Sequence, residues 1–263
     1  MRALAARASH PDDRAMPSFP EVAPGVHTIL DGAWWFSGIR GANVYLLRLP
    51  SGAHVLIDTG MPGSDRAIIE RLTALGITHV DAILLTHRHP DHAGSAARLR
   101  EALGTRVIVG AGDVRDGFVR GERRMPFAPS PADLALPPEE CEPLPGILAI
   151  PLPGHTAGST VYLVPSLNLW CIGDIALHSG DRMSRPLPPM NEDTPAQERA
   201  LQALAARCGA NGAPGHGDPV VGGFGDLLRV LAARPPARGP WWLRVLLNPR
   251  AMARFTRRQA SKR

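Results

Sequence analysis

The segment from His87 to His92 concentrates side chains that can bind metal ions. Three histidines and one aspartate, His87, His89, Asp91 and His92, lie within six residues of a chain that has ten histidines in all. Imidazole nitrogens and carboxylate oxygens are ligands that zinc and similar divalent ions take from proteins. A surface loop that merely carries histidines is the ordinary alternative, but so dense a cluster favours a metal site.

The spacing within this segment predicts that it serves two adjacent metal ions. His87 and His89 alternate in an extended stretch and would point the same way. Asp91 and His92 follow after the chain has turned, so they would face a neighbouring point. The preceding segment 80–85 is apolar and typical of a short buried strand. The cluster is therefore expected at the end of a strand, where α/β sheets commonly hold their sites.

Strand-like and helix-like patterns alternate along most of the chain, which is typical of a layered α/β protein. Irregular segments are expected at 111–145 and 177–194. Thr194 is predicted to cap a helix whose first residue is Pro195. The predicted strands cover 26–30, 43–49, 54–57, 80–85, 106–109, 147–151, 160–164 and 167–172, and the predicted helices cover 64–75, 95–103, 194–208 and 223–233.

The bulk composition is that of an ordinary globular protein, with 44% hydrophobic and 20% charged residues. No apolar run is long enough to span a bilayer. The first twenty residues hold no apolar stretch of the kind a secretory signal needs, so we expect a cytoplasmic protein, with Met1 or Met16 as its start. Three widely spaced cysteines form no CxxC pair, which favours small buried side chains over a disulfide framework.

The positive charge is concentrated at the C-terminal end. From Arg234 onward there are nine Arg and Lys residues and no Asp or Glu, so the net charge of +5 leaves 5 − 9 = −4 for residues 1–233. We expect a disordered lead at 1–19, one domain at 20–233 and a basic, Trp-containing tail at 234–263. The tail could pack on the body, attach to an anionic membrane or form a dimer contact. No dedicated nucleic-acid module is evident, and a small-molecule substrate is expected.

Further motifs occur downstream in a fixed order. They are Pro153–Thr156 (PGHT), Gly173-Asp174 and Gly215–Gly217 (GHG), and the earlier Asp58 stands in LIDTG. Together with HxHxDH at His87–His92, this series resembles the metallo-β-lactamase superfamily over roughly residues 20–233. The resemblance implies an αββα four-layer sandwich of two mixed sheets flanked by helices.

The resemblance also implies a set of metal ligands. One ion would be held by His87, His89 and His155, the other by Asp91, His92 and His216, with Asp174 between them. Two divalent ions, zinc in the first place and Fe or Mn as alternatives, would share a hydroxide that attacks an ester-like bond. Asp91 would also act catalytically by steering that nucleophile. Asp58 would accept a hydrogen bond from a ligand imidazole and fix its tautomer.

The branch of the superfamily is less well defined by the motifs than the chemistry is. Asp174 stands where clinical β-lactamases have cysteine, and Leu177 where many lactonases have tyrosine. The expectation is a hydrolase of a thioester, lactone or related bond, either glyoxalase II-like or a generic member of the superfamily. Glyoxalase II typically adds a helical domain after the fold, and only 263 − 216 = 47 residues follow His216 here. The alternative is a persulfide dioxygenase-like oxidoreductase with a single iron. Trp35 and His178 are candidate substrate contacts.

Overall fold

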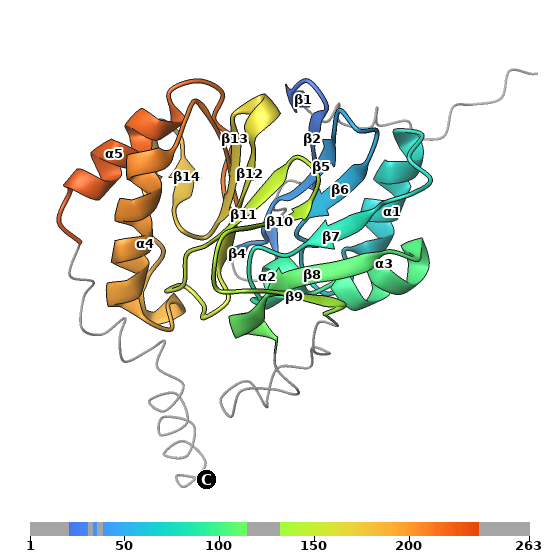
Figure 1. Cartoon of the computed structure of the whole chain (residues 1–263), viewed down its shortest axis with the longest axis horizontal. Coiled ribbons are helices and arrows are strands. Elements are labelled where there is room, and N and C mark those ends of the chain that lie inside the picture. Colours follow the sequence, from blue (N-terminus) through green and yellow to red (C-terminus); the bar gives the residue numbers. More distant parts are fainter. Residues whose placement is uncertain (1–20, 31–33, 36–38, 115–131, 237–263) are drawn as a thin grey trace, which may run out of the picture.

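The computed structural model describes residues 21–30, 34–35, 39–114 and 132–236. Within these ranges two β-sheets lie face to face, and helices cover the outer face of each sheet (Figure 1). This four-layer arrangement confirms the predicted αββα sandwich. The predicted lead at 1–19 and nearly all of the predicted tail, from residue 237 on, lie outside the described residues.

The first sheet ends in parallel strands that carry the HxHxDH segment. The strand order is β1-β2-β5-β6-β7-β8-β9, antiparallel from β1 to β6 and parallel from β6 to β9. The short β7 has three buried residues, and His87 follows it within three positions. The strands of the first sheet are β1 (Glu21–Ala23), β2 (Val26–Leu30), β5 (Val44–Arg48), β6 (His54–Ile57), β7 (Ala82–Leu84), β8 (Arg106–Gly110) and β9 (Leu134–Leu136).

The second sheet carries the remaining motifs. Its order is β10-β11-β12-β13-β16, with β13 and β16 parallel and the other pairs antiparallel. The strands are β10 (Cys141–Leu144), β11 (Ile147–Pro151), β12 (Thr160–Val164), β13 (Leu169–Gly173) and β16 (Asn211–Pro214). Two hairpins stand outside the main sheets, β3 (Trp34–Trp35) with β4 (Ile39–Arg40) and β14 (Leu177–Ser179) with β15 (Arg182–Ser184).

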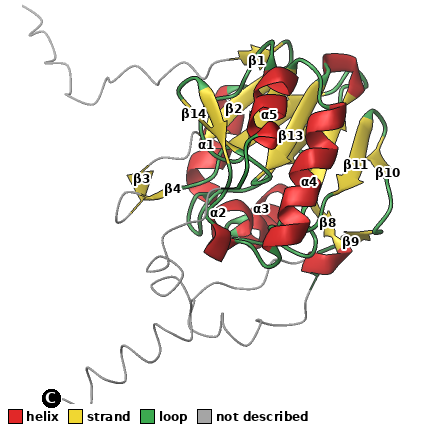
Figure 2. Ribbon diagram, turned by 90° about the vertical axis from the view of Figure 1, so that its left-hand side faces the viewer, coloured by secondary structure: helices red, strands yellow, loops and turns green. Residues whose placement is uncertain are grey.

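Three apolar layers hold the sandwich together because every sheet face and helix stripe must be buried. The central layer packs the two sheets against each other and includes Tyr45 and Tyr162. One outer layer packs α1 and α3 on the first sheet, and the other packs α4 and α5 on the second. Figure 2 shows α4 and α5 in front of β13. The helices are α1 (Asp65–Ala74), α2 (Pro90–Ala93), α3 (Ala96–Leu103), α4 (Thr194–Arg207) and α5 (Phe224–Ala233).

Several details differ from the sequence prediction. The cap of α4 is Asp193 and not Thr194, because the Asp193 carboxylate accepts the backbone N–H of Ala196 at 2.9 Å while Thr194 is already helical. The segments expected to be irregular contain β9, β10 and the β14–β15 hairpin. The prediction also missed β16, the strand that leads to His216.

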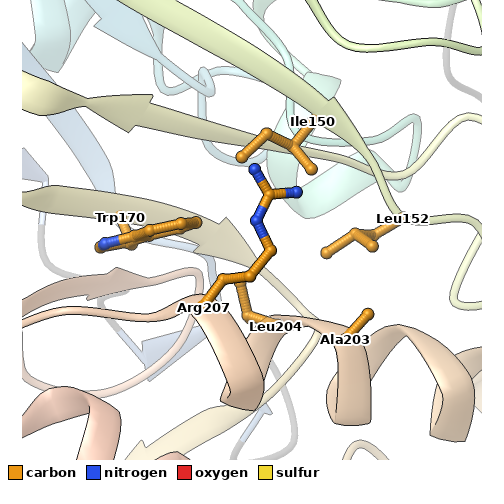
Figure 3. Close-up of a pocket in the computed structure, with 6 residues that line it drawn as sticks. All are labelled: Ile150, Leu152, Trp170, Ala203, Leu204 and Arg207. Carbon is orange, nitrogen blue, oxygen red and sulfur yellow. The ribbon is translucent and has the colours of Figure 1, made fainter.

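A pocket lies between the second sheet and α4, and none of its lining residues belongs to the seven candidate ligands (Figure 3). Its one charged group, the Arg207 guanidinium, pairs with Glu140. The lining residues are Ile150, Leu152, Trp170, Ala203, Leu204 and Arg207. This pocket offers little that could do chemistry. None of the helices in the described part of the chain is long and apolar enough to cross a membrane.

Candidate metal centre

The motifs converge where strand ends of the two sheets meet. Tyr162 of the second sheet donates to the Leu85 carbonyl at the end of β7, at 2.8 Å, and Tyr45 of the first sheet donates to the Pro214 carbonyl at the end of β16, also at 2.8 Å. The Thr160 backbone N–H donates to the Thr86 carbonyl at 2.9 Å. These bonds tie each sheet to a strand end that carries a metal-binding motif of the other sheet.

Three imidazoles form one group of potential ligands. One nitrogen each of His87, His89 and His155 lies within 4.8 Å of the other two. His87 Nε2 and His89 Nδ1 are 3.0 Å apart, and His155 stands edge-on to both rings. His87 and His155 are buried, so their nitrogens have little access to water.

Asp91, His92 and His216 form the adjacent group, again with one donor atom each within 4.8 Å. Asp91 Oδ2 lies 3.2 Å from His216 Nε2 and 3.9 Å from His92 Nε2. The short helix α2 starts at Pro90 and contains both Asp91 and His92. His92 also converges with His87 and Asp174, with one donor atom each within 4.8 Å.

Asp174 lies between the two groups. Its Oδ2 is 3.4 Å from His155 Nε2 and 3.4 Å from His216 Nε2, and its Oδ1 is 3.3 Å from His92 Nε2. One carboxylate therefore faces histidines of both groups. The structure thus brings together all seven residues that the resemblance implied as ligands, in two sets joined by one aspartate.

The donor atoms of this cluster fit a metal-binding site. Buried polar atoms in proteins are almost always hydrogen-bonded. Yet His92 Nε2, His155 Nε2 and Asp174 Oδ1 are all buried and make no hydrogen bond, although both histidine nitrogens lie within 3.4 Å of the Asp174 carboxylate. Adjacent buried nitrogen and oxygen atoms that make no hydrogen bond can be satisfied by a divalent cation, and the mixed His/Asp set suits zinc or iron.

Asp58 orients His92 from an unusual backbone conformation. Its φ is +62°, in the left-handed region that few residues other than glycine adopt. In this conformation Oδ2 lies 2.8 Å from His92 Nδ1, while Oδ1 accepts the Thr86 backbone N–H at 2.7 Å. A carboxylate at Nδ1 places the proton there and leaves Nε2 with its lone pair facing the cluster.

Two further residues act on the ligands and were not predicted from the sequence. Asn191 Oδ1 lies 2.8 Å from His155 Nδ1, so it plays for His155 the part that Asp58 plays for His92. The Asn43 side-chain amide donates to the carbonyls of Pro214 and Gly217, at 3.1 and 2.6 Å, and so holds the loop of His216. Neither residue stands in a recognisable motif, because its role depends on contacts with distant parts of the chain.

The electrostatics differ between the two groups. Burial, together with repulsion from neighbouring imidazoles, lowers the pKa of His87 and lowers that of His89 to about 4. Burial acts in the same direction on His92 and His216, but nearby carboxylates outweigh it, raising the pKa of His92 and raising that of His216 to about 9. Burial raises the pKa of Asp174, but the adjacent histidines outweigh it and the pKa falls. The neutral form is therefore favoured for His87 and His89, whereas His92 and His216 form ion pairs with nearby carboxylates.

Gly215, which has no side chain, lets the His216 loop pass close to the cluster. A Cβ atom on Gly215 would lie 2.5 Å from Asp174 Oδ1 and 2.6 Å from His92 Cε1, closer than real contacts allow. The adjacent His178 donates its backbone N–H to the His216 carbonyl, and its Nδ1 lies 2.7 Å from the Asp218 carbonyl. Trp35 lies in the β3–β4 hairpin. His178 and His216 meet through their backbones, so the substrate contacts of the His178 and Trp35 side chains stay predictions.

An αββα sandwich whose sheets meet at a cluster of histidines and aspartates defines a class of metal-binding protein. The family model of the metallo-beta-lactamase superfamily matches residues 37–218. The chain therefore belongs to the metallo-beta-lactamase superfamily.

Three similar proteins illustrate the relationship. Hydroxyacylglutathione hydrolase from Acidiphilium cryptum (strain JF-5) is 36% identical over 159 residues, or 59% of this chain and 56% of that protein. Thioesterase pkgB from Emericella nidulans is 26% identical over 226 residues, or 83% of this chain and 59% of that protein. The crystal structure of TTHA1623 in a di-iron-bound form is 27% identical with a TM-score of 0.57, and the match covers 73% of this chain and 94% of that one. The chain spans little more than half the length of the first two.

Proposed function

We propose that the chain is a metal-dependent hydrolase that cleaves a thioester or a related ester-like bond in a small molecule. Two divalent ions, zinc in the first place, would be held by His87, His89 and His155 and by Asp91, His92 and His216. The observation that carries this proposal is the position of Asp174, whose carboxylate faces His92, His155 and His216 at 3.3–3.4 Å. A carboxylate that faces both groups would offset the repulsion between two cations held there.

The names of the relatives support the class of bond. One is a hydroxyacylglutathione hydrolase and another a thioesterase, and the matches cover 59% and 83% of this chain. The di-iron form of TTHA1623 supports a site for two ions and keeps iron as an alternative to zinc. Asp174 in place of cysteine argues against a dedicated β-lactamase.

The chain's own residues would divide the catalytic work. Two bound divalent ions would activate water as a nucleophile and polarise the bond that is attacked. Asp58 and Asn191 hold the Nδ1 atoms of His92 and His155, so that both Nε2 atoms face the centre. Asp91 is the most exposed carboxylate of the cluster, with 25% of its side chain open compared with 10% for Asp174. It is therefore placed to accept a hydrogen bond from an attacking water.

Metal quantification on the purified protein, combined with a panel of thioesters, lactones, β-lactams and phosphodiesters, tests this proposal. We expect about two zinc-like ions per chain, hydrolysis of a thioester or lactone, and loss of that activity in Asp91→Ala and His155→Ala. His79→Ala, an exposed histidine outside the cluster, should leave activity unchanged. One iron per chain with oxygen consumption on a persulfide would overturn the hydrolase in favour of the oxidoreductase.

A further inference from the structure

Asp113 is a buried carboxylate that lies beside the metal centre without belonging to it. It is the last residue of a 3₁₀ turn, η1 (Ala111–Asp113), that follows β8. Its side chain has no exposed surface, yet it is not among the groups whose donor atoms converge. A charge this deeply buried is costly unless it is well satisfied by hydrogen bonds, so its partners indicate why it is there.

Those partners come from two metal-binding loops. Asp113 Oδ2 accepts the backbone N–H of Arg88 at 2.9 Å and the Thr156 hydroxyl at 2.7 Å. Its Oδ1 accepts the backbone N–H of Gly158 at 2.9 Å. Arg88 stands between His87 and His89, and Thr156 directly follows His155. One carboxylate thus joins the two loops that carry the three-histidine group.

The backbone is shaped to bring this carboxylate in. A Cβ atom on Gly112 would lie 2.3 Å from the Ala157 carbonyl oxygen. A Cβ atom on Gly158 would lie 2.6 Å from Asp113 Cβ, and one on Gly110 would lie 2.1 Å from the Gly158 carbonyl oxygen. Only because all three residues are glycines can η1 and the loop after His155 approach so closely.

Two more charged residues extend the contact. The Arg88 guanidinium lies 3.4 Å from Asp113 Oδ1 through Nε and also pairs with Glu192. Glu192 in turn accepts the Ala157 backbone N–H at 2.8 Å and donates its own N–H to the His155 carbonyl at 3.0 Å. The chain of ion pairs from Asp113 through Arg88 to Glu192 therefore links the same two loops a second time.

We propose that Asp113 is a positioning residue that fixes His87 and His89 relative to His155 and thereby sets the affinity of the three-histidine subsite for its ion. Its carboxylate accepts hydrogen bonds from Arg88, Thr156 and Gly158, which all lie in the loops of the three-histidine group. We therefore expect its influence to fall mainly on that subsite. This inference rests on the proposed metal-binding function.

The test uses the full chain loaded with ¹¹³Cd²⁺ and observed by ¹¹³Cd NMR. The wild type should give two resonances, which His89→Ala and His216→Ala assign to the two subsites. In Asp113→Asn the new amide nitrogen cannot accept a hydrogen bond, so a backbone or hydroxyl donor of the loops loses its partner. We expect the His89-dependent resonance to shift or vanish and its affinity in chelator competition to fall about tenfold or more, as for other residues that orient ligands.

Matched variants separate positioning from general destabilisation. Asp133→Asn removes another carboxylate that accepts a β8 backbone N–H, from Val107 at 2.8 Å, and should leave both resonances unchanged. Glu192→Gln should lower the metal affinity of the same subsite as Asp113→Asn. It tests the inference in place of Asp113→Asn if that variant does not fold after treatment with chelator. Loss at both subsites alike, or at neither, would overturn the inference. A single resonance from the wild type would contradict the proposal of two ions but not this inference. The inference then stands if that resonance is lost in both His89→Ala and Asp113→Asn, and it falls if the resonance is lost in His89→Ala but kept in Asp113→Asn.

Discussion

Individual side chains that contact the candidate ligands, but are not ligands themselves, help to orient them. Asp58 keeps a left-handed backbone, a conformation that costs on the order of 1 kcal/mol or more for residues other than glycine. In return its carboxylate reaches both the Thr86 backbone and His92 Nδ1. Strained backbone of this kind persists where the surrounding structure holds it in place, commonly at functional sites. Here it lets Asp58 fix the tautomer and the orientation of His92.

Replacing Asp58 by Asn tests this role with little change of shape. Asn tolerates the left-handed region, so the backbone conformation at φ +62° is retained while the negative charge is lost. We expect zinc affinity to fall about 10- to 100-fold, the range for residues that orient ligands. Competition with a chromophoric chelator measures it. Asp81→Asn, which removes a carboxylate that accepts the His54 backbone N–H at the other end of the sheet, is the control. Equal affinities for Asp58→Asn and the wild type would contradict the assigned role.

Proton competition should distinguish the two subsites. A metal ligand must be deprotonated, and with the metal removed the pKa of His216 is about 9, so this imidazole carries a proton at pH 7. The affinity of its subsite should therefore rise with pH, about tenfold per unit for one displaced proton, and level off above pH 9. His89, with a pKa of about 4, is already neutral, so the three-histidine subsite should show no such rise above pH 5 from this residue.

Calorimetric titration of chelator-treated protein with Zn²⁺ in buffers of different ionisation enthalpy measures the protons released. We expect about one proton or more to be released at pH 7 for the ion that needs His216, and fewer at pH 9.5. The His216→Ala variant should lose that release. Proton release that stays the same from pH 7 to 9.5 would show that the ion pair with Asp91 and Asp174 does not hold a proton on His216.

At the scale of elements, the start of α4 supports two of the metal-binding loops. The Asp193 backbone N–H donates to the Gly154 carbonyl at 2.9 Å, next to His155. The Gln197 side chain donates to the carbonyls of Asp174 and Ile175, at 3.2 and 2.9 Å. The first turn of α4 thus fixes the positions of both loops, and its own stability depends on the cap that begins it.

Two neighbouring substitutions identify that cap. Asp193→Ala removes the acceptor for the Ala196 N–H and should lower the free energy of unfolding by about 1 kcal/mol. Thr194→Ala removes a long hydrogen bond of 3.3 Å to the Pro188 carbonyl and should cost about 0.5 kcal/mol or less. Urea unfolding of chelator-treated protein compares them. The reverse order would restore Thr194 as the cap.

The elements also show what sequence could and could not predict. The strands β2, β6, β11 and β12 match the predicted ranges because their apolar residues and flanking turns are local signals. The strand β16, with the sequence NGAP, carries no such signal and exists because β13 pairs with it in parallel. The same holds for single residues. His87–His92 is dense enough to be found in isolation, whereas Asn191 and Asp113 gain their roles from partners 25 or more positions away.

At the scale of the whole molecule, the candidate site lies at the seam between the two sheets. His87, His89, Asp91 and His92 follow β7 of the first sheet, while Asp174 and His216 follow β13 and β16 of the second. An ion bound by both sets is bound only by the assembled sandwich, because the unfolded chain does not hold these groups together. Metal binding should therefore stabilise the fold as a whole and not merely order a loop.

Removal of the metal tests this coupling between site and fold. Free metal at 100 times its dissociation constant stabilises the native state by about 2.7 kcal/mol, which for a domain of this size raises Tm by roughly 5–10 °C. We expect stripping with chelator to lower Tm by that amount and added zinc to restore it. His155→Ala and His216→Ala should each lose part of the gain, whereas His79→Ala, outside the cluster, should keep it. An unchanged Tm after complete removal of the metal would contradict this coupling. The sheets would then be held together by their apolar layers and by the hydrogen bonds of Tyr45 and Tyr162 between the sheets, with the ions bound to one sheet.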